Sequence, residues 1–224
     1  MRLRPACFFL FAASVVFAAA TLGLAALAPL RGAPAAPAAP AAACPHCAPN
    51  PPTDAAEPAP AYSRESIYQL DARFTNDSGN AFALGELRGR PVVLNMFFAS
   101  CGYACPLQVT DMLALRGKLA PGVRERAVFV LVSFDVAHDT PAELARYRAQ
   151  RNLDGQWILL HGDNAAVREL AALVGVKYRQ DAKGTFSHSN ILTILNSEGE
   201  IVHQRVGLKG GLDDDATALT ATVK

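Results

Sequence analysis

The sequence lacks a charge excess of either sign. Its 224 residues carry a formal net charge of +1, and from Tyr62 to the C-terminus 18 basic residues stand against 18 acidic ones. Proteins that bind nucleic acid need clustered Lys and Arg to neutralise phosphates, so this balance argues against nucleic acid as a partner. It gives no indication of an anionic binding surface either.

Cysteine is scarce as well. Five cysteines are too few to form a disulfide scaffold in a chain of 224 residues. They comprise the single Cys7 and two close pairs, Cys44/Cys47 and Cys101/Cys105. Close pairs are typical of metal binding or thiol redox chemistry rather than of cross-links between distant elements.

Charged residues are missing from Ala6 to Leu30, directly after the basic head Met1-Arg-Leu-Arg4. A basic head before an apolar run directs the following chain across a membrane. This run is long enough for a spanning helix. We therefore expect residues 1–30 to be a single uncleaved anchor in a bacterial inner membrane, with the rest of the chain in the periplasm. A cleaved signal peptide is the alternative.

Bulky apolar residues are nearly absent from residues 31–61, where Ala and Pro dominate. Such a segment cannot bury a core, so we expect a flexible linker, with the folded domain spanning residues 62–224. The linker contains Cys44-Pro-His-Cys47. Two interpretations of this motif stay open. Cys44, His46 and Cys47 form a second metal or redox site on a flexible arm, or the pair closes a small disulfide loop without function.

The apolar pattern of residues 62–224 alternates between strands and helices. Pro91–Phe98 and Ala127–Phe134 are continuous apolar runs, as expected of strands buried on both faces. Thr140-Pro-Ala-Glu143 is a capping box that opens a helix. The other expected elements are hairpins over 67–84 and 191–206, helices at 106–119 and 164–174, and a strand at 157–160. This order predicts an α/β fold with a mixed sheet and helices on both faces.

The strongest candidate for chemistry is Cys101-Gly-Tyr-Ala-Cys105-Pro106, which lies between a predicted strand and a predicted helix. Backbone N–H groups at a helix N-terminus favour thiolate over thiol, so we expect the pKa of both cysteines to be lowered. Two soft thiolates select a soft cation, above all Cu(I). The oxidised pair could instead close a disulfide.

Two thiolates make an incomplete metal site, and His188 is the candidate for the third ligand. It directly precedes the predicted strand at 191–195. If that strand runs antiparallel to Pro91–Phe98, its beginning lies at the sheet edge where Pro91–Phe98 ends, and His188 comes close to the cysteines. Asp135 ends a parallel strand on the same rim, where α/β sheets place their ligands, and is a possible supporting residue. The other histidines of the predicted domain, His138, His161 and His203, are expected on the surface or in loops.

These residues together resemble the SCO/SenC proteins, in content and order, from about Tyr62 to Val206. The resemblance rests on Pro91–Phe98, Cys101-x-x-x-Cys105-Pro106, Ser133-Phe-Asp135 followed by Asp139-Thr-Pro141, Leu160-His-Gly162 and Ser187-His188-Ser189. It implies a thioredoxin-like fold, an N-terminal membrane anchor, and copper bound by the two cysteines and the histidine. It also implies a role in assembling the copper-A centre of cytochrome c oxidase. Gly102-Tyr-Ala104 departs from the family's more common Pro and Asp between the cysteines.

Three functions compete for the Cys101/Cys105 pair. The leading hypothesis is a copper metallochaperone without turnover chemistry, which serves the copper-A subunit of cytochrome c oxidase or another periplasmic copper protein. The second is a thiol–disulfide oxidoreductase that keeps a partner's copper-binding cysteines reduced. The third, a thioredoxin-fold peroxidase, ranks last because no Thr or Arg stands within the Cys101–Cys105 loop.

Overall fold

The computed structural model of the protein describes residues 61–182 and 184–223. The predicted anchor and nearly all of the predicted linker, including Cys44, His46 and Cys47, lie outside the described residues. Among the helices of the described ranges, none has both the length and the apolar character that crossing a membrane requires.

Three parallel strands form the centre of the main sheet: β3 (Val92–Phe97), β4 (Val128–Ser133) and β5 (Trp157–Gly162). Every residue of β3 and β4 is buried. A strand covered on both faces cannot alternate apolar with polar residues, which is why the sequence shows continuous apolar runs here. The prediction of two strands buried on both faces is confirmed.

The complete sheet has seven strands in the order β2-β1-β5-β4-β3-β8-β9. The outer strands are antiparallel to their neighbours. They are β1 (Phe74–Asn76), β2 (Ala81–Phe82), β8 (Ile191–Leu195) and β9 (Ile201–Val206). In the register of β8 on β3, Leu195 pairs with Val92 and Leu192 pairs with Asn95. The beginning of β8 therefore lies at the C-terminal end of β3, as the sequence predicts for a mixed sheet.

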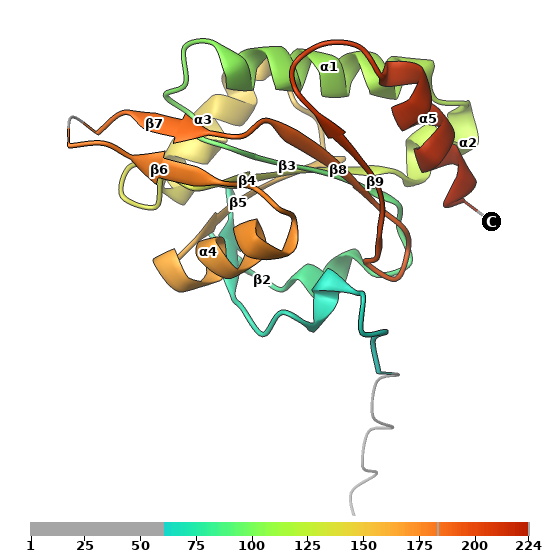
Figure 1. The fold of residues 1–224 in the computed structure, drawn as a ribbon, viewed down its shortest axis with the longest axis horizontal. Helices are drawn as coiled ribbons and strands as arrows, with labels where there is room; N and C mark the ends of the chain where they lie inside the picture. Colours follow the sequence, from blue (N-terminus) through green and yellow to red (C-terminus); the bar gives the residue numbers. More distant parts are fainter. Residues whose placement is uncertain (1–60, 183, 224) are drawn as a thin grey trace, which may run out of the picture. The chain divides into compact units, whose positions relative to one another are not determined.

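Helices cover both faces of this sheet, as predicted. Figure 1 shows α1 (Ala104–Lys118) and α5 (Leu212–Ala221) on one side of the sheet and α4 (Asn164–Leu173) on the other. Side chains from α1, α2 (Pro121–Arg126), α3 (Pro141–Arg151) and α5 share one buried apolar cluster with the strands. Those from α4 share a second cluster with the opposite face of the strands.

Local signals set several helix ends as expected. The Thr140 side chain accepts a hydrogen bond from the Glu143 N–H at the start of α3. Gly175 has a φ of 71° just after α4. This left-handed conformation favours glycine, so the helix stops there. Helix α1 begins at Ala104, two residues earlier than predicted, and this places Cys105 inside its first turn.

Five features differ from the sequence prediction. Residues 67–69 form a short 3-10 turn rather than a strand, because Ser66 Oγ accepts from the Tyr68 N–H and both residues are buried. A second 3-10 turn spans Leu84–Leu87. Helices α2 and α5 were not expected, since each buries few side chains. The two-stranded sheet of β6 (Tyr178–Gln180) and β7 (Phe186–His188) was not expected either.

Candidate metal centre

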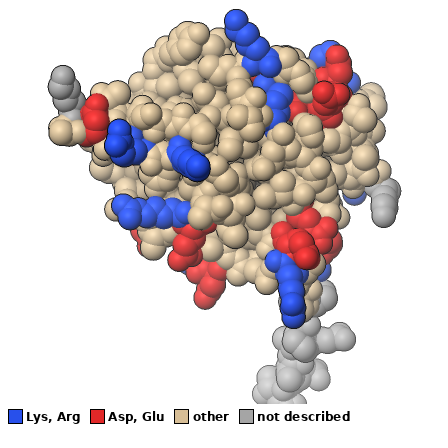
Figure 2. Space-filling view, in the orientation of Figure 1, with Lys and Arg blue, Asp and Glu red and all other residues tan. Residues whose placement is uncertain are grey.

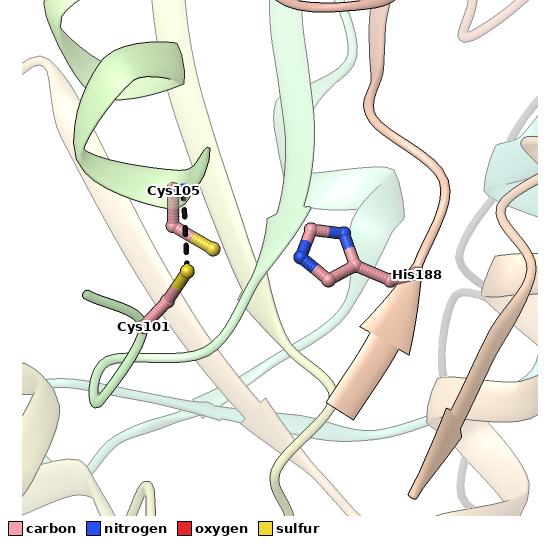
Figure 3. Close-up of side chains that lie close together, drawn as sticks. All are labelled: Cys101, Cys105 and His188. Atoms are coloured by element: carbon pink, nitrogen blue, oxygen red, sulfur yellow. Dashed lines mark hydrogen bonds between the residues drawn. The ribbon is translucent and has the colours of Figure 1, made fainter. Parts of the chain in front are cut away.

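The two cysteines lie where the chain passes from β3 into α1. Cys101 is in the connecting loop and is partly exposed, whereas Cys105 is the second residue of α1 and is only 1% exposed. Both are free thiols. The Cys105 N–H donates a hydrogen bond of 3.4 Å to Cys101 Sγ (Figure 3). The first turn of α1 therefore directs a backbone donor at the sulfur of Cys101.

The pKa values of the two thiols are shifted in opposite directions. Burial alone would raise the pKa of Cys101, but backbone hydrogen bonds from Cys105, Tyr103 and Ala104 outweigh it, and the pKa is lowered. Burial raises the pKa of Cys105 well above that of an ordinary thiol. The expectation that both pKa values fall was therefore wrong for Cys105. A helix N-terminus stabilises a thiolate, but this sulfur lies too deep in the protein for that effect to prevail.

His188 is the last residue of β7 and is partly exposed. Its ring packs edge-on against Phe98, with ring centroids 5.8 Å apart. It also packs against Phe134, with tilted ring planes and centroids 5.2 Å apart. Its Nδ1 lies 3.1 Å from the carbonyl oxygen of Ser189. A carbonyl can only accept, so Nδ1 is the donor, and in the neutral ring Nε2 is the nitrogen that can bind a metal. The ring is thus oriented as in a typical metal-ligating histidine.

The fold brings these three residues together. One sulfur or nitrogen atom from each of Cys101, Cys105 and His188 lies within 4.8 Å of the others. Figure 3 shows one ring nitrogen of His188 facing the two sulfur atoms. His188 and Cys105 are 83 residues apart in sequence, and the antiparallel pairing of β8 with β3 closes this gap. Two sulfurs and one imidazole nitrogen are a donor set that fits a soft copper ion.

Asp135 and Asp139 both follow β4, and they point to different partners. The Asp135 carboxylate accepts a 2.8 Å hydrogen bond from Nδ1 of His138, whose side chain is 72% exposed. Asp139 Oδ2 accepts from the Ala99 N–H at 2.7 Å and from Ser133 Oγ at 2.5 Å. Asp139 therefore ties β4 to the loop that carries Cys101. A role for Asp135 at the site stays a prediction.

Sequence reasoning did not single out Asp139 as a site residue. Its carboxylate is 3% exposed, and its negative charge contributes to the raised pKa of Cys105. Burial raises the pKa of Asp139 itself, against the lowering effect of its two hydrogen bonds. A buried carboxylate next to a capping Thr-Pro pair is a weak signal in sequence, because the same pattern usually only caps a helix.

Tyr147 of α3 is a second residue that the sequence did not indicate. Its ring packs on Phe97 with centroids 5.1 Å apart, and its hydroxyl is buried without a hydrogen-bond partner in the described part of the chain. Burial raises the pKa of Tyr147 to about 12, with smaller contributions from Cys105 and Cys101. The phenol therefore stays neutral beside the two thiols.

Among the described residues, the other histidines are not part of this group. His161 lies on β5 and its Nδ1 contacts the carbonyl oxygen of Asp139 at 3.0 Å. His203 lies on β9, where its Nε2 contacts the buried Asp215 at 3.1 Å. Both are strand residues with partly buried side chains rather than the surface or loop residues expected. His138 is in a loop, as predicted.

Comparison with known proteins agrees with this geometry. The sequence model of the SCO1/SenC family matches residues 61–217, which are most of the chain. The chain belongs to the SCO1/SenC family. The resemblance noted in the sequence is thereby confirmed, since the matched range contains Cys101, Cys105 and His188.

Individual relatives have low sequence identity to this chain, but the matches cover most of both chains. A Stutzerimonas stutzeri protein, named as a proposed copper-binding protein, is 30% identical over an alignment of 149 residues. The match covers 64% of this chain and 71% of that protein. Among solved structures, a proposed electron transfer protein of Aquifex aeolicus superposes with a TM-score of 0.63 at 23% identity, covering 72% of this chain and 95% of that one. Bradyrhizobium japonicum ScoI, solved with copper bound, gives 0.56 at 21% identity, covering 68% and 97%. The thioredoxin-like α/β fold that the resemblance implied is confirmed.

Proposed function

We propose that this SCO1/SenC protein binds one copper ion through Cys101, Cys105 and His188 and delivers it to the copper-A centre of cytochrome c oxidase. The observation that carries the proposal is the approach of two sulfurs and one imidazole nitrogen to within 4.8 Å of one another. Soft thiolate and imidazole donors favour copper. Solved relatives with copper bound, from Bradyrhizobium japonicum and Arabidopsis thaliana, support the choice of metal.

The three ligands have different parts in this proposal. Cys101 is the readily ionised thiol, because three backbone hydrogen bonds favour its thiolate. Cys105 is held protonated by burial, so it must lose its proton when the metal binds. His188 offers Nε2, since the Ser189 carbonyl holds the proton on Nδ1. Copper uptake therefore releases at least the Cys105 proton and becomes tighter as the pH rises.

Copper loading of matched variants tests the proposal. The full-length protein is loaded anaerobically with Cu(I), and copper is counted by elemental analysis after gel filtration. Wild type should retain one copper ion, Cys101→Ser/Cys105→Ser none, and His188→Ala a weakly held ion with altered X-ray absorption. His138→Ala is the matched control, because that imidazole is exposed and faces Asp135. Retention of a full copper ion by the double serine variant would refute the assignment.

A second candidate function, a thiol–disulfide oxidoreductase, is supported by the unequal thiols. The Cys101 thiolate would attack one sulfur of a partner's disulfide and release the other as a thiol. The Cys105 thiolate, formed by loss of its proton, would then attack Cys101. This closes the Cys101–Cys105 disulfide and leaves the partner with two reduced cysteines. A partly exposed Cys101 of lowered pKa and a buried Cys105 suit these two steps.

His188→Ala separates the two functions. The imidazole has no part in the exchange of thiols, so the oxidoreductase predicts that this variant still reduces a disulfide and still supports oxidase assembly. The metallochaperone predicts that assembly fails although the Cys101–Cys105 pair remains reducible. Titration of the reduced pair with a thiol reagent provides the internal control for an intact dithiol.

The location of the protein is part of the same proposal. A copper-A centre assembles outside the cytoplasm, so the apolar run from Ala6 to Leu30 would anchor the domain in the bacterial inner membrane with the site in the periplasm. Cys44 and Cys47, between this run and the domain in the sequence, would then form a second copper-capturing arm. Replacement of both by Ser, with unchanged copper stoichiometry and delivery, would dispose of the arm.

A further inference from the structure

Access to the three ligands is limited to one surface. Cys105 is buried, and Cys101 and His188 are only partly exposed. If the protein hands over copper by ligand exchange, as proposed above, the thiols of the acceptor must come within bonding distance of the ion. The acceptor therefore has to rest on the surface that surrounds Cys101 and His188.

That surface is unusually apolar for solvent-exposed residues. Within residues 61–182 and 184–223, the two most exposed large apolar side chains are Val206, at 74%, and Tyr103, at 72%. Tyr103 stands between the two cysteines. Leu107, which is 41% exposed, lies one helical turn further along α1. We call Tyr103, Leu107 and Val206 the apolar collar.

Val206 lies on the same side of the sheet edge as the start of β8, through the pairing of β9 with β8. It is the register partner of Ile191, which follows His188 by three residues. The neighbouring Arg205 donates a 3.1 Å hydrogen bond to Asp111 of α1, so the end of β9 is held against that helix. The apolar collar therefore comes from two segments, the start of α1 beside the two cysteines and the end of β9 beside the start of β8. Isolated exposed apolar residues are common, but a set gathered around a functional site indicates a contact surface.

A basic area adjoins the ligand His188. Arg168, Lys177 and Arg179 are exposed, and within the described residues none of them has an ion-pair or hydrogen-bond partner for its side-chain charge. Arg179 and Tyr178 lie on β6, where Tyr178 is the register partner of His188. Figure 2 shows basic side chains gathered over β6 and α4, next to an uncharged area over the start of α1. We call Arg168, Lys177 and Arg179 the basic patch.

We propose that the apolar collar is the docking surface for the copper acceptor, and that the basic patch binds carboxylates at the edge of the same partner. The acceptor is a protein that presents its thiol donors within an apolar loop and carries acidic residues beside that loop. Tyr is among the residues that contribute most to binding at interface centres, and complementary charge mainly speeds and orients association. The inference rests on the proposed function, because it assumes that the site gives up copper to a protein.

The test uses the full-length chain in detergent and the soluble apo copper-A domain of the oxidase from the same organism. Binding is measured by calorimetry, and copper transfer by metal analysis of the two separated proteins. Tyr103→Ser and Val206→Ser should each weaken binding about tenfold or more and slow transfer in proportion. Leu113→Ser and Val202→Ser are matched controls, because these residues are 40% and 47% exposed on the same helix and strand but outside the collar.

The outcomes separate this proposal from the proposed function. All four variants must first bind one copper ion as wild type does; if wild type binds none, the proposed function fails. If copper binding is intact but the collar variants dock and transfer normally, the docking surface is wrong. The same holds if wild type does not associate with the copper-A domain, or if the collar instead mediates a dimer of this chain in sedimentation. Arg179→Glu should weaken docking at low salt. If it has no effect, the proposal that the basic patch binds carboxylates of the partner is wrong.

Discussion

Replacement of Asp139 by Ala tests how the loop that carries Cys101 is held. Its Oδ2 accepts from the Ala99 N–H at 2.7 Å and from Ser133 Oγ at 2.5 Å. A hydrogen bond to a charged acceptor contributes about 1.5–3 kcal/mol. Burial raises the pKa of this carboxyl, so we take about 1.5 kcal/mol for each hydrogen bond. The two hydrogen bonds together should then contribute about 3 kcal/mol to the free energy of unfolding. In a domain of this size, that loss corresponds to a fall in Tm of about 6–12 °C.

The assay is urea unfolding of the metal-free, reduced protein, followed by circular dichroism. Copper affinity is measured in the same preparation at low temperature, where the variant is still folded. The copper affinity should fall, because Asp139 holds the N–H of Ala99, and the candidate ligand Cys101 is only two residues further along the same loop. Asp135→Ala is the comparison, since the carboxylate of Asp135 faces the exposed His138. A stability loss below about 1 kcal/mol for Asp139→Ala would refute the reasoning, because a lost buried pair of hydrogen bonds cannot cost so little.

Asp139→Asn separates hydrogen bonding from charge. The amide oxygen can accept the same two hydrogen bonds, and the variant has no charge to bury. A carboxyl whose folded pKa is raised contributes stability at pH below its unfolded pKa of about 3.9 and loses it as pH rises through the folded pKa. The Asn variant should therefore equal or exceed wild type in stability near pH 7 and lose that advantage toward pH 3. Equal pH dependence of the two proteins would show that Asp139 is not buried as described.

Two further predictions concern other parts of the domain. Arg205→Ala leaves the fully buried carboxylate of Asp215 without its 2.7 Å partner, so the free energy of unfolding should fall by about 3–5 kcal/mol in urea titrations. Lys118→Ala breaks an exposed pair and should cost less than about 1 kcal/mol. In the reduced, metal-free protein, iodoacetamide should label Cys101 before Cys105, and below the pH at which an ordinary thiol reacts. Peptide mass spectrometry that finds Cys105 labelled first would contradict the unequal burial of the two thiols.

The strands and the cysteine pair could be recognised in the sequence because their signals are local. Continuous apolar runs marked β3 and β4, and a capping Thr marked the start of α3. The short helices and the β6–β7 sheet could not be recognised. Helix α5, for example, buries only Asp215 and Leu219, too few residues for an apolar period to appear. Its buried Asp215 also departs from the usual pattern, in which charged residues face the solvent. The burial is tolerated because Arg205, which lies on a different element, pairs with this carboxylate.

The candidate metal centre also has features that the sequence predicted and features that it could not predict. Cys101 and Cys105 are close in sequence. Their position between a predicted buried strand and the start of a predicted helix sufficed to identify them as candidates. The proximity of His188 was inferred from an assumed antiparallel pairing, which the register of β8 on β3 bears out. The protonation of the thiols could not be inferred, because it depends on burial. Only the packed core around α1 makes Cys105 a buried thiol and leaves Cys101 as the partly exposed one.

By itself, the sequence indicated which residues are candidates for the chemistry and placed the cysteine pair between a strand and a helix, because residue type, spacing and apolar period act over a few positions. It did not show that His188 lies on a strand of its own, β7. The tertiary structure alone decided which side chains surround those residues. Asp139, Tyr147 and the apolar collar come from different segments of the chain and meet at the site only when the sheet is assembled. Desolvation depends on that assembly. The candidate ligands could therefore be recognised in the sequence, whereas the pKa values of the thiols and the proposed docking surface could not.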